Sequence, residues 1–377
     1  MEILIGADIV PTKSNINSFV SGNAVEMVGK EICNILDDAD FRIFNLEVPL
    51  VDKEMPISKI GPNLIAPAKC VFGYKALKSD LLTLANNHIM DQGLQGLEST
   101  MNLLDQVGIS YVGAGKNLKD ASKPYIFVCG QHRIGIYACA EHEFSIATET
   151  SEGANPIDFL ETPDHVASLK SQCDYVIVLY HGGKEQYRYP SPTLQKVCHK
   201  LVEKGADLIV CQHSHCIGCE EKYKDSTIVY GQGNFLFNKY DNEFWSSSLL
   251  IRITDGFKID YIPIKRCGNG ICIAKGDLKE RIIKDFTYRS NEIMRSEAVT
   301  NRYAELANEN IGSYLLNMLG IRRGIVFRVL NRISGYRLER FIIAHICKKK
   351  VPLVLMNYIE CEAHRDLILE GLKEVTR

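Results

Sequence analysis

Long hydrophobic runs and an excess of one charge are both missing from this sequence of 377 residues. No run approaches the roughly 18 apolar residues that a membrane-spanning helix needs, so no such helix is expected. Residues 1–6 lead directly into a strand pattern, which argues against a secretory signal peptide. With 46% hydrophobic and 24% charged residues, the composition excludes a disordered chain, a collagen and a coiled-coil array.

Cysteine is abundant but shows no paired pattern. The 13 cysteines are an odd number, scattered from Cys33 to Cys361, and several, such as Cys211, lie inside apolar strand patterns. A secreted disulfide scaffold is smaller and denser in cysteine. We therefore expect free, buried thiols in a reducing compartment, and hence a cytoplasmic protein.

The net charge of -2 conceals two parts of opposite charge. Residues 286–377 hold 15 Lys and Arg against 10 Asp and Glu, a balance of +5, which leaves -7 for residues 1–285. The apolar pattern changes from strands to helices near the same position. We therefore expect an acidic domain over residues 1–285 and a basic helical region over 286–377.

Apolar runs of strand length alternate with helical patterns in the first part of the chain. This order predicts a mixed α/β architecture that ends in a strand-rich stretch. The predicted strands cover residues 2–6, 41–44, 80–84, 109–112, 125–128, 134–138, 175–180, 208–211, 226–230, 247–253 and 258–263. The predicted helices cover 24–36, 94–107 and 191–204, and then 291–308, 312–319, 324–333 and 338–346 in the C-terminal region.

The basic C-terminal region allows two interpretations. Between residues 321 and 350, nine Lys and Arg stand against one acidic residue, Glu339, with apolar residues between them. Such helices can lie on an anionic membrane surface as a peripheral contact, or hold an acidic polymer. We favour helices packed on the acidic domain with their arginines in water. No recognised nucleic-acid-binding motif accompanies the charge, so no nucleic-acid partner is expected.

Candidate metal ligands follow five of the predicted strands, at the point where each strand ends. The carboxyl ends of strands in α/β sheets are where ligand sites form. A mixture of carboxylate, amide and imidazole groups suits one or two divalent ions such as Mn, Fe or Zn. The residues in these positions are Asp8, Asn45, Glu47, Asn86, Asn87, His88, His181, His213 and His215.

Each of these residues taken alone has a plain structural explanation. An Asp after a strand most often forms a turn or caps a helix, and a single histidine such as His88 most often caps or faces solvent. His213 and His215 are a stronger signal, because histidines at i and i+2 converge only on a bent loop. A polar loop is the alternative for that pair. The five strand ends together favour a metal site.

Several motifs occur in the order found in one protein family. They are FNLEVP at 44–49, LANNH at 84–88 with Asp91 and Gly93, GAGKN at 113–117, HGGKE at 181–185, GAD at 205–207, QHSH at 212–215 and GQGNF at 231–235. Over residues 1–265 the chain resembles the bacterial CapA-type capsule and poly-γ-glutamate synthesis proteins. That family is similar to the calcineurin-like metallophosphoesterases. The resemblance implies a metallophosphoesterase-type layered α/β sandwich, with a helical C-terminal extension here.

The resemblance also implies roles for residues at matching positions. His88 takes the position of the general acid that protonates the leaving group. Two metal ions in such a centre activate water and stabilise in-line phosphoryl transfer. The implied metal ligands are Asp8 and His215 for a first ion, Asn87, His181 and His213 for a second, and Glu47 as the bridge between them.

Two positions depart from the superfamily pattern. The usual opening is Asp-x-His, whereas Asp8 is followed here by Ile9 and Val10. Glu47 stands where the bridging residue is usually an aspartate. The first metal site therefore lacks one imidazole, which leaves catalysis with one metal, or no catalysis, as alternatives to a two-metal centre.

Two further groups near the histidines have competing interpretations. Glu185 and Arg188 follow His181 and either contact an anionic substrate or lie on a solvated loop. Cys216 and Cys219 form a CxxC pair, which suits a structural zinc ion or a disulfide, but no second such pair exists. We favour buried thiols behind the metal-binding loop.

These features together predict a cytosolic, metal-dependent phosphoesterase-like hydrolase in capsule or surface-polymer synthesis, the polymer being a polysaccharide or poly-γ-glutamate. Its substrate would be phosphorylated or related to an anionic polymer, and its partners would belong to the capsule synthesis machinery. The alternative, motivated by the imidazole missing after Asp8, is a non-catalytic accessory protein that binds an anionic polymer or a synthase partner. A ligase or transferase is less favoured, because the sequence has no nucleotide-binding loop.

Overall fold

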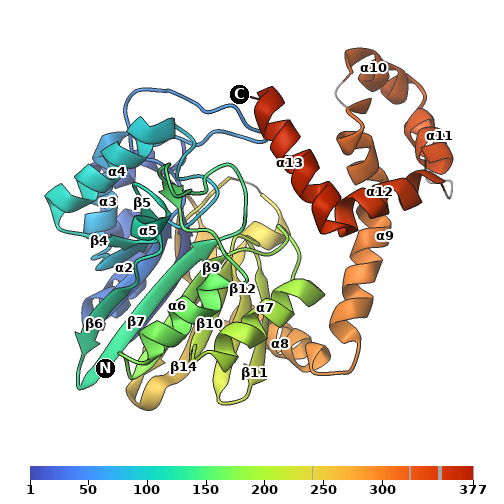
Figure 1. Cartoon of the computed structure of the whole chain (residues 1–377). Coiled ribbons are helices and arrows are strands. Elements are labelled where there is room, and N and C mark those ends of the chain that lie inside the picture. The colour runs from blue at the N-terminus through green and yellow to red at the C-terminus, as the bar shows by residue number, and fades with distance from the viewer. Residues whose placement is uncertain (240, 322–323, 347–349, 377) are drawn as a thin grey trace. The chain divides into compact units, whose positions relative to one another are not determined.

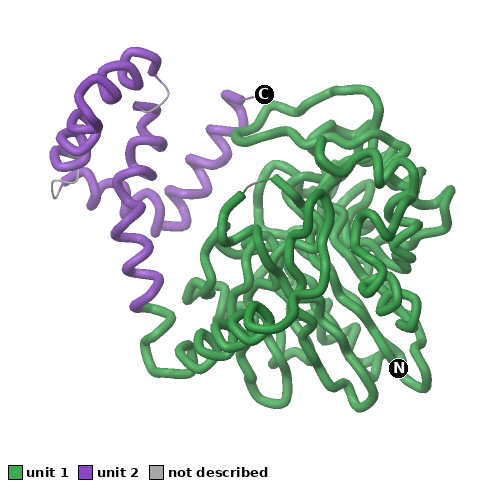
Figure 2. The backbone as a smooth tube through the Cα atoms, turned by 180° about the vertical axis from the view of Figure 1, so that it is seen from behind, with its two compact units in different colours: residues 1–300 green, residues 301–377 purple. Residues whose placement is uncertain are grey.

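The computed structural model describes residues 1–239, 241–321, 324–346 and 350–376. The chain forms two compact units, residues 1–300 and 301–377 (Figure 2). The first unit holds both large sheets, and the second consists of helices (Figure 1). The change of sequence pattern near residue 286 thus falls inside the first unit. The assignment of separate roles to residues 1–285 and 286–377 stays a prediction.

A seven-stranded sheet forms one half of the first unit, in the order β15-β14-β13-β1-β2-β3-β4. Strands β1 to β4 run parallel, whereas β13, β14 and β15 pair antiparallel beside β1. The parallel strands are β1 (Ile3–Ile9), β2 (Phe41–Leu46), β3 (Leu81–Thr83) and β4 (Ser110–Val112). The antiparallel strands are β13 (Ser247–Thr254), β14 (Lys258–Cys267) and β15 (Gly270–Ile273).

A six-stranded sheet forms the other half, in the order β11-β12-β10-β9-β7-β6. Its four inner strands run parallel, and an antiparallel strand closes each edge. The inner strands are β7 (His132–Ala140), β9 (Tyr175–His181), β10 (Leu208–Gln212) and β12 (Ser226–Gln232). The edge strands are β6 (Tyr125–Cys129) and β11 (Ile217–Tyr223), and the short strands β5 (Ala114–Gly115) and β8 (Gly153–Ala154) pair separately.

Helices cover the outer face of each sheet. The seven-stranded sheet packs against α1 (Ile16–Ser21), α2 (Ala24–Asp38), α3 (Val71–Ala76) and α4 (Gly93–Val107). The six-stranded sheet packs against α6 (Glu161–Lys170) and α7 (Pro192–Glu203). The remaining helical elements of this unit are α5 (Leu118–Ala121), α8 (Gly276–Ile293), η1 (Ala68–Cys70), η2 (Glu243–Trp245) and η3 (Asp255–Phe257).

The two sheets face each other across a shared apolar layer. Alternate residues of a strand point to opposite faces, so each parallel strand contributes to two cores. In β1, Ile3 and Ile5 enter the layer between the sheets with Ile177 of β9, whereas Leu4 packs under the helices with Ile32. The order of layers is helices, sheet, sheet, helices (Figure 1). The layered α/β sandwich that the sequence predicts, with a helical C-terminal region, is confirmed.

In the second unit, the described residues form helices joined by short turns. Asn331, which is buried, joins two of its helices, because its Nδ2 donates to Oε2 of Glu339 at 2.8 Å and its Oδ1 accepts the backbone N–H of Glu339 at 3.0 Å. In the described part of the chain, no helix combines the length and apolar character needed to cross a membrane. The helices are α9 (Ala298–Met318), which begins in the first unit, α10 (Ile325–Ile333), α11 (Arg337–Ile346), α12 (Lys350–Glu360) and α13 (Glu362–Thr376).

Several strands extend further than the sequence predicts. β1, β2 and β9 run to Ile9, Leu46 and His181, so that Asp8, Asn45 and His181 are the last or next-to-last residues of a strand and do not follow it. The pairing of β1 with β2 shifts register between Ile5 and Asp8, and this irregularity carries the strand past Gly6. The predicted strand ends were therefore early by one to three residues.

Candidate metal centre

The strand-end residues named from the sequence lie together in the first unit. β1 supplies Asp8, and Glu47 directly follows β2. The turn after β3 supplies Asn87, and β9 supplies His181. The loop after β10 supplies His213 and His215. The carboxyl edges of both sheets meet here, so residues from distant parts of the sequence come within contact distance. The six predicted metal ligands are all buried: Asp8, Glu47, Asn87, His181, His213 and His215.

One half of the cluster surrounds the Nε2 atom of His181. This nitrogen lies 3.1 Å from Oδ1 of Asn87, 3.1 Å from Nδ1 of His213 and 3.5 Å from Oε1 of Glu47. Its other ring nitrogen, Nδ1, accepts from Nδ2 of Asn45 at 3.3 Å, which fixes the orientation of the ring. The residues that the resemblance assigns to the second metal therefore converge on one point.

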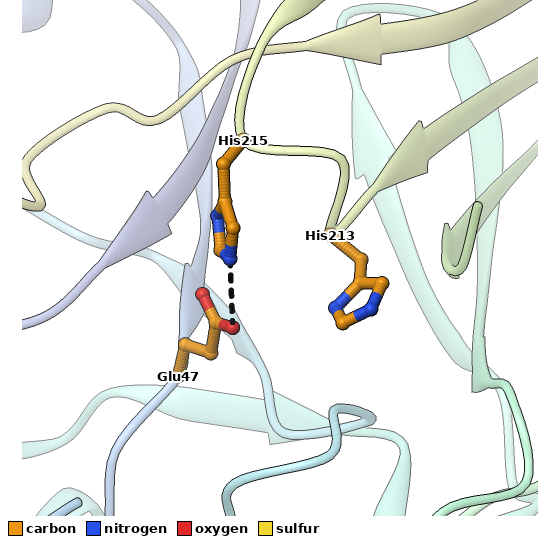
Figure 3. A group of neighbouring side chains, drawn as sticks. All are labelled: Glu47, His213 and His215. Atoms are coloured by element: carbon orange, nitrogen blue, oxygen red, sulfur yellow. Dashed lines mark ion pairs between the residues drawn. The ribbon is translucent and has the colours of Figure 1, made fainter. Parts of the chain in front are cut away.

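The other half of the cluster joins Asp8, His215 and Glu47. Oδ2 of Asp8 lies 3.3 Å from Nδ1 of His215, and Nε2 of His215 lies 4.0 Å from Oε1 of Glu47 (Figure 3). Oδ1 of Asn234 lies 2.8 Å from the same Nδ1. Glu47, His213 and His215 each offer one ligand atom, and these atoms lie within 4.8 Å of one another. Glu47 thus takes part in both halves.

The loop between β10 and β11 is held in a constrained conformation. His213 and His215 have φ angles of 74° and 54°, in the left-handed region that residues with a Cβ rarely occupy. Gly231 packs beneath this loop with a φ of 104°, and a Cβ there would lie 2.6 Å from Oγ of Ser214. The backbone turns twice within three residues, which brings both imidazoles to the same side.

Burial and charge shift the pKa values of these groups in opposite directions. Burial lowers the pKa of His213 well below its ordinary value, and the charges of His181 and His215 lower it further. Burial also acts to lower the pKa of His215, but the Glu47 and Asp8 carboxylates outweigh it and raise that pKa to about 9. Burial acts to raise the pKa of Asp8, but the hydrogen bond and charge of His215 and the charge of His181 hold it below its ordinary value.

The donor set fits a divalent cation. Both carboxylate oxygens of Glu47 are buried, and no described residue gives them a hydrogen bond. Buried carboxylate oxygens without partners are costly, because they have lost their hydration and gained nothing in its place. A cation held between these oxygens and the imidazoles of His181, His213 and His215 would supply the missing charge. The residues to hold such an ion are therefore present.

His88 belongs to a buried network beside the cluster. Its Nδ1 donates to Oδ2 of Asp91 at 2.6 Å, which leaves Nε2 as the nitrogen that can transfer a proton. Asp91 also pairs with the ammonium group of Lys59 and accepts the backbone N–H of Leu64 at 2.6 Å. The charge of His88 contributes to the lowered pKa of His213, so the two rings are close enough to interact.

Three contacts of the cluster were absent from the ligand set assigned from the sequence. Asn45 donates to Oδ1 of Asp8 at 2.8 Å, and Asn234 contacts His215. Glu143 accepts from Nδ2 of Asn87 at 3.1 Å. Asn234 and Glu143 follow β12 and β7, so the strand-end pattern could have identified both of them. Lys59 comes from an irregular loop, and no sequence pattern points to it.

Among the described residues, neither of the two residues predicted to contact substrate hydrogen-bonds to a predicted metal ligand. Glu185 is exposed, and among the described residues its carboxylate has no hydrogen bond or ion pair. Arg188 donates to the carbonyl of Ile217 at 2.9 Å and lies 3.6 Å from Oε1 of Glu243. Their contact with a substrate stays a prediction. In the CxxC pair, both cysteines are buried free thiols, as the favoured interpretation expects.

The fold and site define a two-sheet α/β protein with a buried carboxylate and imidazole cluster at the meeting edges of its sheets. The sequence model of the family described as "Bacterial capsule synthesis protein PGA_cap" matches residues 5–239. That stretch covers more than half of the chain and contains all six predicted metal ligands. The chain belongs to this family of bacterial capsule synthesis proteins.

Two relatives carry names from capsule and polymer synthesis. The chain is 29% identical over 234 residues to the capsule biosynthesis protein CapA of Bacillus anthracis, a match that covers 60% of this chain and 57% of that one. It is 29% identical over 227 residues to the PGA biosynthesis protein CapA of Bacillus subtilis strain 168, covering 58% and 59%. The chain thus spans less than two thirds of the length of these relatives.

Solved structures with a similar arrangement are more distant. A phosphatase from Mycoplasma pneumoniae superposes with a TM-score of 0.42 and 15% sequence identity, over 75% of this chain and 96% of that one.

Proposed function

We propose that this chain is a metal-dependent hydrolase of phosphoester bonds that acts in the synthesis of a capsule or another surface polymer. The observation that carries the proposal is the buried carboxylate of Glu47, whose two oxygens have no hydrogen-bond partner among the described residues while His181 and His215 lie within 4.0 Å. A buried arrangement of this kind is unfavourable without a cation and favourable with one.

The proposed ligands divide into two groups that share Glu47. Asp8 and His215 would hold one divalent ion, and Asn87, His181 and His213 a second one. Mn, Fe and Zn all accept this mixture of oxygen and imidazole ligands. When bound, such ions act as Lewis acids toward a phosphoryl oxygen and activate water for attack at phosphorus.

The proposed general acid is His88. Asp91 accepts the Nδ1–H of His88 and directs Nε2 away from itself. Nε2 would give its proton to the leaving oxygen of the ester. Lys59 shares Asp91 with His88, so the buried carboxylate is neutralised while the histidine gives up its proton.

The polymer connection comes from the family and from the named relatives. The names of the two CapA proteins refer to capsule biosynthesis and to PGA biosynthesis. As part of the proposal, we assign this chain to the same kind of process. The substrate would then be a phosphorylated or otherwise anionic compound related to the polymer, and the partners would be components of the synthesis machinery. A cytoplasmic location belongs to the same proposal.

The proposal is tested on the purified full chain by metal analysis and a panel of phosphate esters. We expect bound Mn, Fe or Zn, hydrolysis that is lost on chelation and restored by metal, and a large loss in His88→Asn. His142→Asn is the matched control, because His142 is an exposed histidine on the segment after β7. A protein without metal, whose His213→Ala variant behaves as the parent does, would overturn the enzyme proposal.

The non-catalytic alternative makes the opposite prediction in cells. If the chain only binds an anionic polymer or a synthase partner, His88→Asn leaves capsule formation intact, whereas charge reversals in the basic C-terminal helices abolish it. If His88→Asn abolishes capsule formation and the reversals do not, the accessory role is excluded.

A further inference from the structure

A pocket lies in the first unit, next to the loop that carries His215. Its volume is about 890 Å³. Ile217, two residues beyond His215, lines it, and so do Glu243 and Ser246, which flank Trp245. The ring of Trp245 packs on the ring of His215 with 4.6 Å between centroids. The pocket and the metal cluster therefore share one loop and one aromatic contact.

The wall of this pocket is rich in cations. Arg188 lies in the segment after β9, Lys265 and Arg266 lie on β14, and Arg281 and Arg289 lie on α8. The carboxylates of Asp241, Glu243 and Asp285 also line the pocket, so positive groups outnumber negative ones. Among the described residues, Lys265, Arg281 and Arg289 have no carboxylate within ion-pair distance. These three cations are therefore available to pair with an anionic ligand.

Two of the guanidinium groups bind carbonyls of consecutive residues in the same strand, β11. Arg188 donates through Nη1 to the carbonyl of Ile217 at 2.9 Å, and Arg289 donates through Nε to the carbonyl of Gly218 at 2.7 Å. Burial lowers the pKa of Arg289, and the charge of Arg188 lowers it further. Two like charges fixed at adjacent carbonyls form a preorganised site for an oxyanion, which relieves their repulsion.

The spread of the cations indicates an extended ligand. Arg281 and Arg289 lie eight positions apart on α8, which places their Cα atoms about 12 Å apart. A single phosphate cannot reach both ends, whereas carboxylates on alternate residues of an extended chain recur about every 7 Å. Asn242, Ser246 and Ser247 add amide and hydroxyl groups along the pocket, and these suit the N–H and C=O groups of an amide-linked chain.

We infer that this pocket binds a segment of an amide-linked acidic polymer through several carboxylates at once. All of its lining residues except Arg188 and Ile217 follow residue 239, beyond the stretch that matches the family model. The pocket is thus built by β14, α8 and the segment around η2. The choice of an acidic polymer rests on the function proposed above, whereas binding is measured without turnover.

The test uses metal-free full-length protein and the fluorescence of its single tryptophan, Trp245, which lies beside the pocket. We titrate hexaglutamate, with hexaglutamine as the uncharged ligand of the same length and with polyphosphate as a second polyanion. Saturable quenching by hexaglutamate, weakened by salt and absent with hexaglutamine, is expected. Because chelated protein is used, a negative result would leave the proposed hydrolysis untouched.

Variants locate the binding in this pocket. Arg281→Gln and Lys265→Gln should each weaken hexaglutamate binding about tenfold, the range for one charged hydrogen bond. Lys284→Gln is the matched control, because Lys284 is exposed on the same helix and does not line the pocket. Unchanged binding by Arg281→Gln and Lys265→Gln would overturn the inference. Equal binding of hexaglutamine, or binding of polyphosphate without hexaglutamate, would also overturn it.

Discussion

Single residues of the cluster show how an unfavourable arrangement marks a site. Glu47 is fully buried, yet its carboxylate has no hydrogen bond from any described residue, and a fold that needed only an apolar core would not retain it. His213 and His215 add backbone strain at the same place. Unfavourable features that gather at one point are explained most simply by a bound cation.

Replacing Glu47 should therefore separate stability from metal binding. At a pH above about 9, where His215 has lost its proton, we expect Glu47→Gln to stabilise the metal-free protein by about 1–3 kcal/mol, because the substitution then removes a buried carboxylate that receives no hydrogen bond. The same variant should lose metal affinity by at least about tenfold, since the oxygen ligand shared by both halves is gone. Urea unfolding after chelation and calorimetric metal titration measure the two effects. A metal-free variant less stable than its parent would show that Glu47 is satisfied by the protein alone.

Asp91 is expected to act through His88. Asp91→Asn replaces the acceptor at His88 Nδ1 with an amide that can donate, which favours the wrong tautomer of the ring. We expect kcat to fall about 100-fold, within the range that a positioned general acid contributes, while metal content stays the same. Phosphoester kinetics and metal analysis of both proteins measure these effects. A change in KM alone, with kcat unchanged, would show that Asp91 does not act through His88.

The pKa of His215 predicts how the metal-free protein responds to pH. This pKa is raised from 6.5 to about 9, so the folded state binds the proton more tightly than the unfolded state does. The resulting stability is fully present below about pH 6.5 and is lost as pH rises through about 9. A shift of this size corresponds to about 3 kcal/mol. The urea midpoint of the chelated protein should decrease as pH rises from 6.5 to 9.5. The midpoint of the His215→Asn variant should decrease less over the same range.

Metal should reverse this dependence. A ligating histidine must be deprotonated, so metal affinity should increase as pH rises toward 9 while the stability of the metal-free protein decreases. Parallel slopes for the loaded and chelated protein would indicate that His215 is not a ligand.

At the scale of elements, the sequence predicts the parallel strands well and the remaining elements less well. The parallel strands are continuous apolar runs because both of their faces are buried, so their existence is readable without the fold. β11 was not predicted, since its second half is Glu-Glu-Lys-Tyr and its apolar part is short. α6 was missed for a similar reason, because Pro163 and charged residues interrupt its apolar pattern. α12 and α13 were not predicted either.

The candidate site was more predictable than its surroundings. Its ligands come from strand ends, where residue type and position together carry the signal, although their roles stay predictions. Lys59 has no such signal. In the cationic pocket, Arg188 was predicted to contact an anionic substrate, but its pairing with Arg289 was not predicted, because the two are linked only through the carbonyls of β11. Contacts that depend on tertiary packing between distant segments cannot be read from local patterns.

We predict that helix α10 makes a peripheral contact with a membrane surface. Ile325 and Ile333 are 70% and 77% exposed, and Arg328 and Arg332 lie between and beside them on the same short helix. Anionic vesicles should therefore retain the protein better than zwitterionic ones, with about 1 kcal/mol from each arginine. Cosedimentation of the double variant Arg328→Gln/Arg332→Gln should show at least a tenfold weaker partition into anionic vesicles. Lys373→Gln on α13 is the control, and equal binding to both vesicle types would exclude this contact.

At the scale of the whole molecule, the limits of the family match and of the folded unit differ. The family model ends at residue 239 and the sequence resemblance at 265, whereas the first compact unit continues to residue 300. α8 accounts for the difference, since Ile282 and Phe286 are buried against Leu249 and Ala274. Ile293 and Val299 also enter the core beneath the six-stranded sheet. The segment after the matched stretch is therefore part of the domain that holds the site.

This difference predicts the behaviour of two truncated chains. The four apolar clusters of the described structure contain no residue beyond Val299, so a fragment of residues 1–300 should unfold cooperatively and bind metal as tightly as the full chain. A fragment of residues 1–265 lacks Ile282, Phe286 and Ile293 and should be destabilised by several kcal/mol, about 2–5 for each large buried side chain lost. Urea unfolding and metal titration of both fragments beside the full chain measure this. If the fragment of residues 1–300 fails to fold or to bind metal, the second unit contributes to the site. If the fragment of residues 1–265 is as stable as the longer fragment and binds metal as tightly, α8 is dispensable and the domain ends where the sequence resemblance ends.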